Sequence, residues 1–166
     1  MLIAVISDTH LPRGNRTLPP ACVERLRGAD LILHAGDFVT AAVLADLRAL
    51  GPPVEAVHGN VDDAEVRMLL PSARMVRVGG ARIAMTHDGG PAAGRLQRLR
   101  ERFRDVDAVV FGHSHIPLHE HDETSGLQIF NPGSPTDRRR QPVHTMGVAR
   151  VSESGELTFE HVELGP

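Results

Sequence analysis

The sequence predicts an α/β fold, a sandwich of two β-sheets flanked by helices. The first half alternates short apolar runs with amphipathic segments, which indicates parallel strand–helix–strand units. The second half contains paired short apolar runs around glycine-containing turns, a pattern typical of β-hairpins. A chain of 166 residues suits one domain with a sizeable core, so we expect residues 1–166 to form a single domain.

The first half is predicted to contain three strands and two helices. Continuous apolar runs such as MLIAVIS indicate buried strands. Gly28 is a plausible end for the first helix, and Thr40 is a plausible N-cap for the second. We expect strands within residues 1–7, 29–38 and 53–63, and helices over 20–27 and 41–50.

The second half is predicted to be rich in hairpins. Gly79-Gly80, Ser125-Gly126 and Ser154-Gly155 each separate two strand-like runs. We expect hairpins within residues 73–90, 117–134 and 145–164, an amphipathic helix over 91–105, and a strand within 106–115.

Composition excludes several functional classes. The formal net charge of −3 and pI near 6.3 argue against general nucleic-acid binding. All 18 basic residues are arginine, and their spread along the chain favours coding bias over a dedicated phosphate site. The single Cys22 can form no intramolecular disulfide and is expected to be a small buried hydrophobe.

The chain is expected to be cytoplasmic. It begins directly with a core strand and has no cationic leader or cleavage site. No apolar run approaches the roughly 20 residues that cross a bilayer, so we expect no membrane partner.

Polar side chains follow the predicted strands at the points where the strands end. Asp8 and His10 follow the first strand and, if the chain stays extended through Thr9, point to the same side. Ligands in α/β sheets bind beyond the carboxyl ends of strands. Oxygen and imidazole donors at this edge suit divalent metals. The predicted ligands are Asp8, His10, Asp37, Asn60, His87, His113 and His115.

Seven ligands exceed the number that one transition metal usually takes, so we expect two ions. Asp37, central in chain order, is the candidate bridging carboxylate. Paired ions form the clamp that phosphoryl hydrolysis uses. Two divalent ions, Asp8, Asp37 and one hydroxide would leave a charge of about +1, which suits a phosphodiester monoanion.

The motifs around these residues resemble the calcineurin-like metallophosphoesterases, in particular the small single-domain prokaryotic phosphodiesterases. The resemblance covers residues 1 to about 135, and implies a four-layer α-β-β-α sandwich of two mixed sheets. The motifs are SDTH (7–10), HAGD (34–37), HGNVDD (58–63), THDG (86–89), GHSH (112–115) and NPGS (131–134).

The resemblance implies a dinuclear phosphodiesterase in which a metal-bridging hydroxide attacks phosphorus in line. One metal would be held by Asp8, His10, Asp37 and His115, and the other by Asp37, Asn60, His87 and His113. Asp37 and Asn60 are the expected catalytic residues, Asn60 by stabilising charge on the non-bridging oxygens. Manganese is the first choice because the donors are mixed nitrogen and oxygen; iron, zinc and nickel are alternatives.

Two positions depart from the family pattern. Many relatives carry a histidine after the Gly-Asn pair as general acid for the leaving alkoxide, whereas this chain has Val61, which donates no proton. Small relatives often have His-Gly-His where this chain has His87-Asp88-Gly89. Asp88 either orients a ligand histidine or faces solvent.

Further polar residues are weaker candidates for supporting or substrate-contacting roles. Arg13 could reach a substrate phosphate, although a solvated arginine is the simpler interpretation. His34 is favoured as a satisfied core residue, and His119, His121, His144 and His161 as surface residues. The weak set is His34, His58, Asp62, Asp88 and Arg13.

Two other functions compete with the phosphodiesterase. One is a non-catalytic protein-binding scaffold on the same fold, as in the retromer subunit that resembles this family. The other is a phosphomonoesterase or nucleotide-polyphosphate hydrolase. The expected partner is a small phosphodiester or nucleotide, and the oligomeric state stays open.

Overall fold

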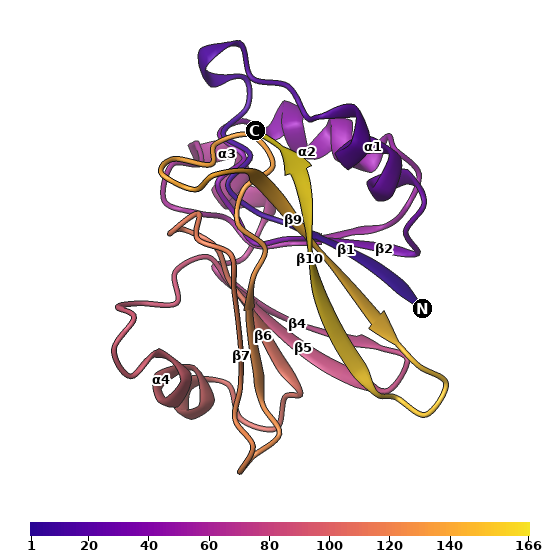
Figure 1. The fold of residues 1–166 in the computed structure, drawn as a ribbon. Helices are drawn as coiled ribbons and strands as arrows, with labels where there is room; N and C mark the ends of the chain where they lie inside the picture. Colours follow the sequence, from indigo (N-terminus) through magenta and orange to yellow (C-terminus); the bar gives the residue numbers. More distant parts are fainter.

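The computed structural model describes residues 1–166 and contains two five-stranded sheets packed face to face, with helices outside them (Figure 1). The strands are β1 (Leu2–Ile6), β2 (Leu31–His34), β3 (Val54–Ala56), β4 (Ala73–Val78), β5 (Ala81–Thr86), β6 (Ala108–Val110), β7 (Leu118–His121), β8 (Gln128–Asn131), β9 (His144–Val151) and β10 (Leu157–Gly165). The helices are η1 (Arg13–Asn15), α1 (Pro20–Arg27), α2 (Ala41–Arg48), α3 (Ala64–Leu69) and α4 (Arg95–Arg102). The predicted α/β sandwich of two mixed sheets is confirmed.

The first sheet has the strand order β10-β9-β1-β2-β3. β1, β2 and β3 are parallel neighbours, as the alternation of strand and helix predicts. The hairpin of β9 and β10 adds to the free edge of β1 in antiparallel sense. The carboxyl ends of β1, β2 and β3 therefore meet at one edge of this sheet.

The second sheet has the order β4-β5-β6-β8-β7. β5, β6 and β8 run parallel, and the outer strands β4 and β7 pair with them as antiparallel hairpins. The hairpins predicted at Gly79-Gly80 and near Ser125-Gly126 are present. Because β5 and β6 are parallel neighbours, their carboxyl ends share one edge of this sheet as well.

Three apolar layers hold the sandwich together. Ile3 and Val5 of β1 face the second sheet, while Ala4 and Ile6 face α1 and α2. Because β1 is covered on both sides, it is a continuous apolar run rather than an alternating one. Leu99 of α4 packs against the outer face of the second sheet. Cys22 is on the buried face of α1, in the cluster with Ala4 and Ile6 of β1, and is fully buried as predicted.

The helices differ from the sequence prediction in three places. α3 was not predicted; Asp63 is its N-cap and accepts a hydrogen bond from Val66 N at 2.9 Å. α4 begins only at Arg95, because the Pro- and Gly-containing segment before it stays irregular. Thr40 precedes α2 as predicted, but its side chain makes no capping hydrogen bond.

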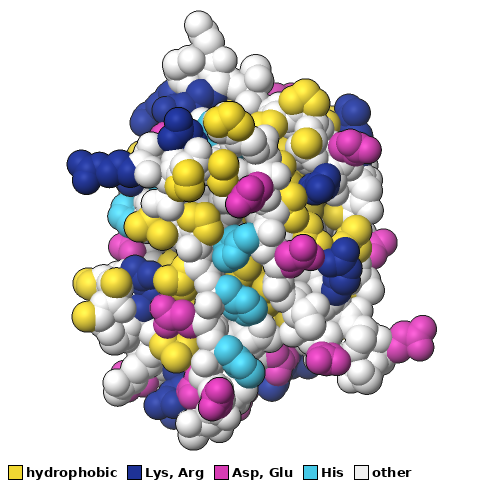
Figure 2. Space-filling model, in the orientation of Figure 1, with side chains coloured by type: hydrophobic (Ala, Val, Ile, Leu, Met, Phe, Trp, Pro, Cys, Tyr) yellow, Lys and Arg dark blue, Asp and Glu magenta, His cyan; other side chains and the backbone are white.

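The C-terminal hairpin closes the open side of the sandwich. His161 of β10 stacks on Phe130 of β8 and hydrogen-bonds the Asn131 carbonyl at 2.7 Å. His161 is therefore half-buried, and its prediction as a surface residue is wrong. Figure 2 shows a row of histidine side chains on this face, where β7 and β10 lie in Figure 1. None of the helices has the length and apolar character needed to span a bilayer.

Candidate metal centre

The loops after five strands bring the seven predicted ligands into one polar cluster. Asp8 and His10 follow β1, Asp37 follows β2, Asn60 follows β3, His87 follows β5, and His113 and His115 follow β6. The cluster lies where the strand-end edges of both sheets meet. Five of the side chains are buried, whereas Asn60 and His113 are exposed at its mouth.

One group of donor atoms forms around Asp8. His10 Nε2 lies 3.2 Å from His115 Nε2, and His115 Nε2 lies 3.3 Å from Asp8 Oδ1. His115 Nδ1 donates to the Asp137 carbonyl, which leaves the lone pair of its Nε2 available to a cation. Together Asp8, His10 and His115 have the spacing of a metal site.

A second group forms around Asn60. Asn60 Oδ1 lies 3.0 Å from His87 Nε2 and 2.9 Å from His113 Nδ1. His87 Nε2 also lies 3.2 Å from Asp37 Oδ2, while its Nδ1 donates to the Ala35 carbonyl at 2.8 Å. That outer hydrogen bond orients the ring and leaves Nε2 as the free donor atom.

Asp37 lies between the two groups. Its Oδ2 is 3.5 Å from His10 Nε2 and 3.2 Å from His87 Nε2. Spacing alone also groups Asp8 with Asp37 and His87, so both buried carboxylates border both positions. The donor set of carboxylate oxygen, amide oxygen and neutral imidazole, without thiolate, fits Mn²⁺, Fe²⁺, Zn²⁺ or Ni²⁺.

The route to this convergence differs from the one predicted. Asp8 and His10 have φ of 55° and 45°, and His113 and His115 have φ of 68° and 59°. The chain is therefore not extended through Thr9, and the alternation argument is wrong for Asp8 and His10. His113 and His115 depart from extended backbone in the same way. Left-handed backbone at residues other than glycine costs about 1–3 kcal/mol each and persists where surrounding contacts enforce it.

Hydrogen bonds from distant residues enforce this backbone. Ser134 Oγ donates to the Asp8 carbonyl at 2.8 Å, and the Asn131 amide donates to the Gly112 carbonyl at 2.8 Å. Thr136 Oγ1 donates to the Thr9 carbonyl. The NPGS motif contains the first two residues, but sequence reasoning assigned them no role. No signal in the sequence indicated Thr136.

Asp62 organises the loops that carry Asp37 and Asn60. Its buried carboxylate accepts hydrogen bonds from Asp37 N at 3.1 Å, Val39 N at 2.7 Å and Gly59 N at 2.6 Å. Asp37 itself has φ of 64°. Asp62 therefore supports the cluster from outside it, through the backbone of the two loops.

Two glycines leave room for the carboxylates. A Cβ atom at Gly59 would overlap Asp37 Oδ1 and lie 2.5 Å from Asp37 N. A Cβ atom at Gly112 would lie 2.6 Å from Asp8 Oδ2. Both glycines are needed for close approach, and neither has a positive φ.

The two buried carboxylates have pKa values displaced in opposite directions. Burial raises the pKa of Asp8 to about 6, although His87 and Ser7 act to lower it. Burial also acts to raise the pKa of Asp37, but its contacts with His87 outweigh this and lower it to about 2. Burial lowers the pKa of His10 and His115, so their rings are held as neutral donors.

The weak candidates fall into different places. His34 is fully buried; its Nδ1 accepts from Gly36 N at 3.1 Å, so its Nε2 donates to Thr9 Oγ1 at 3.1 Å. Burial lowers its pKa to about 3, and both ring nitrogens are used beneath the cluster. His58 is half-buried beside Gly59.

The last two weak candidates, Asp88 and Arg13, do not reach the cluster of predicted ligands. Asp88 is exposed and accepts from Gly90 N at 2.7 Å, so it orients no ligand histidine and the solvent alternative applies. Arg13 is exposed in η1, and its side chain makes no hydrogen bond or ion pair, so nothing directs it toward a substrate phosphate.

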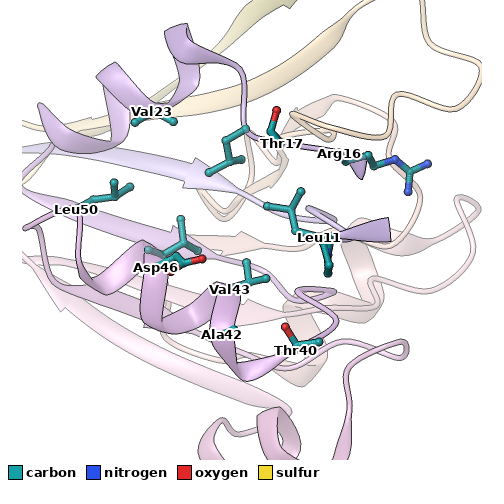
Figure 3. Close-up of a pocket in the computed structure, with 12 residues that line it drawn as sticks. Leu11, Arg16, Thr17, Val23, Thr40, Ala42, Val43, Asp46 and Leu50 are labelled. Carbon is teal, nitrogen blue, oxygen red and sulfur yellow. The ribbon is translucent and has the colours of Figure 1, made fainter. Parts of the chain in front are cut away.

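Two cavities near the cluster differ in character. A cleft of about 380 Å³ begins at Asn60 and His87 and has no apolar side chain in its lining. An apolar groove of about 390 Å³ lies between α1, α2 and the loop after β1, with Leu11, Val23 and Val43 among its lining residues (Figure 3). None of the seven clustered side chains lines the groove, so it lies outside the candidate centre.

Comparison with known proteins places these features in a family. The chain matches the Calcineurin-like phosphoesterase superfamily domain over residues 1–154. It is 36% identical to a probable metallophosphoesterase of Methanothermobacter thermautotrophicus over 167 residues, covering 99% of this chain and 94% of that protein.

Two further proteins add to this comparison. The phosphodiesterase MJ0936 of Methanocaldococcus jannaschii is 24% identical over 149 residues, with 80% of this chain and 83% of that protein covered. The crystal structure of wild-type Vps29 from Entamoeba histolytica complexed with zinc superposes with a TM-score of 0.77 at 22% identity, covering 99% of this chain and 100% of that one. The structural likeness shows a shared fold.

Proposed function

We propose, since this chain belongs to the calcineurin-like phosphoesterase superfamily, that it hydrolyses phosphodiester bonds with two divalent metal ions. The observation that carries the proposal is the contact of Asp37 with both groups of donor atoms, at 3.5 Å from His10 and 3.2 Å from His87. A carboxylate in that position suits a pair of ions better than a single one.

The residues of this chain prepare the site for an anionic substrate. Asp8, His10, Asp37 and His115 would hold one ion, and Asp37, Asn60, His87 and His113 the other. Ions bound there supply Lewis acidity and lower the pKa of water. The exposed positions of Asn60 and His113 leave the mouth open to substrate. The Asn60 amide N–H groups remain free to donate to a non-bridging phosphoryl oxygen, because its Oδ1 faces the histidines.

The convergence of all seven side chains favours catalysis over a protein-binding scaffold. A scaffold would need neither buried carboxylates nor left-handed backbone at the positions that carry the cluster, and each is costly to maintain. The name of the M. jannaschii protein supports phosphodiesters as the substrate class, which the following experiments test directly.

Metal removal is the first test. Protein stripped by chelator and reconstituted separately with Mn²⁺, Fe²⁺, Zn²⁺ or Ni²⁺ should bind about two ions per chain and regain hydrolysis of an aryl phosphodiester. Elemental analysis gives the stoichiometry, and parallel assays with aryl monoesters and nucleotides distinguish a phosphomonoesterase or polyphosphate hydrolase. Activity that persists in chelator with no bound metal would contradict the enzyme proposal.

The leaving group is the second test. Val61 is half-buried, its backbone N–H donates to Asp37 Oδ1 at 3.0 Å, and its side chain offers no proton. General acid catalysis typically contributes 10²–10⁴-fold. Rates for a series of diesters should therefore fall steeply as the leaving-group pKa rises.

The Val61→His variant should make this dependence shallower, provided its imidazole reaches the leaving oxygen. Val61→Leu, which adds bulk without a proton donor, should keep the steep dependence of the wild type. A shallow dependence in the wild type would show that another residue, such as His58 or His10, already supplies the proton.

A further inference from the structure

The cleft beside Asn60 and His87 contains arginines without carboxylate partners. Arg67 is exposed, yet its Nε donates to the Asp62 carbonyl at 2.9 Å and its Nη2 to the Asn60 carbonyl at 2.8 Å. Both acceptors are neutral, so the guanidinium is held in place while its charge stays uncompensated. Its Nη1 makes no hydrogen bond in the structure.

Arg102 lines the same cleft and is also free of ion pairs. Its guanidinium lies 4.8 Å from the centroid of the Phe103 ring, and its N–H groups make no hydrogen bond. By contrast, Arg74, Arg82 and Arg100 all pair with carboxylates elsewhere on the surface. The cleft is distinguished by two arginines that line one polar cavity beside the candidate centre, one of them held in place by neutral carbonyls.

The rest of the lining agrees with an anion site. The only carboxylate in the cleft is Asp88, which already accepts a hydrogen bond from Gly90 N. Ser72 and Thr86 contribute hydroxyl groups, and no apolar side chain is present on which a base or aryl ring could pack. On the adjoining segment, Arg95 and Arg98 also bond only to carbonyls, which adds positive charge nearby.

We propose that this cleft binds a second phosphoryl group of the substrate, so that the enzyme acts on phosphoesters carrying an additional phosphate. The inference rests on the proposed function, because the reacting phosphate is assigned to the metal centre. A fixed guanidinium suits a phosphate because its planar fork matches two phosphoryl oxygens. A cleft of about 380 Å³ that begins at Asn60 has room for one such group.

The test compares two compounds by calorimetry on Mn²⁺-loaded protein without free metal. 3-Hydroxypropyl phosphate carries one phosphate, and propane-1,3-diol bisphosphate carries a second one on the same carbon chain. The bisphosphate should bind about tenfold tighter or more, since charge-assisted contacts to arginine are among the stronger hydrogen bonds. This advantage should shrink with added salt, because the cleft is open to solvent.

Variants locate the second phosphate. Arg102→Gln and Arg67→Gln should each reduce the advantage to below about threefold. Arg77→Gln removes an exposed, unpaired arginine of β4 outside the cleft and should leave it unchanged. Arg102 makes no hydrogen bond or ion pair with the metal cluster, so Arg102→Gln still tests the cleft if Arg67→Gln lowers the metal content. Elemental analysis of each variant measures its metal content.

Two outcomes separate the inference from the proposed function. Equal binding of the two compounds by wild-type protein, or an advantage that survives both arginine substitutions, would overturn the inference even if aryl diesters are hydrolysed. A bisphosphate advantage that depends on Arg67 and Arg102, in protein that hydrolyses no phosphodiester, would support the anion cleft while refuting the phosphodiesterase.

Discussion

Replacing Asp37 with Asn should remove most activity and lower the metal content of both positions. The amide keeps the volume of the side chain and can still accept from Val61 N, which is 3.0 Å from Oδ1. Its NH₂ group would then stand where Oδ2 lies between His10 and His87. Loss of an outer-shell partner alone costs 10–100-fold in metal affinity, so loss of this shared group should lower kcat/KM by at least about 10²-fold.

The matched control for this variant is Asp46→Asn, an exposed carboxylate on α2 that makes no hydrogen bond or ion pair. It should keep wild-type metal content and kcat/KM. Metal content by elemental analysis and kcat/KM with an aryl phosphodiester are measured for both variants. If Asp37→Asn retained two ions and full activity, Asp37 could not be the shared ligand.

Adding one methyl group at Gly59 should disable the centre without changing any donor side chain. The new Cβ would overlap Asp37 Oδ1, and Gly59 N is itself held by Asp62 Oδ2 at 2.6 Å. Either Asp37 or the loop that carries Asn60 must therefore move. Overpacking of this kind costs about 1–3 kcal/mol of folding stability. We expect kcat/KM to fall by about 10²-fold or more, because a shift of about 1 Å is enough.

Gly28→Ala is the control for Gly59→Ala. Gly28 ends α1 with right-handed backbone, and a Cβ atom there would meet its nearest neighbour at 3.5 Å. It should change stability by less than about 0.5 kcal/mol and leave activity intact. Urea denaturation and kcat/KM are measured for both variants. Wild-type kcat/KM and metal content in Gly59→Ala would show that the cluster tolerates displacement of Asp37.

Local sequence was sufficient to predict the strands, most of the helices and the identity of the clustered residues, although it missed α3. Apolar runs such as residues 2–6 are distinguishable from their polar ends, because side chains in a short segment respond mainly to their immediate neighbours. The parallel order of β1, β2 and β3 then follows from crossover connections. The sequence motifs also identified the family, which the match over residues 1–154 confirms. The metal ligation of the cluster stays a prediction.

The positions of the donor atoms were decided by hydrogen bonds between residues that lie far apart in the chain. Asp8 was expected to be placed by local alternation, but it adopts left-handed backbone, as does His113. The His113 N–H donates to the Asp8 carboxylate at 3.0 Å across 105 residues. Ser134 and Thr136 reach Asp8 and Thr9 across more than 120 residues. No local pattern encodes such contacts, because each partner is individually an ordinary loop residue.

Sequence and tertiary structure thus determined different parts of the site. The sequence alone determined which donor side chains follow the strands and which family they belong to. Only the tertiary structure decided that Asp62 anchors the Asp37 loop and that Asp88 faces solvent. It also decided that Arg67, on a helix not predicted from sequence, is held against the carbonyls on either side of Val61. The physical reason is that propensity acts over a few residues, whereas hydrogen bonding and burial depend on which distant segments the fold brings together.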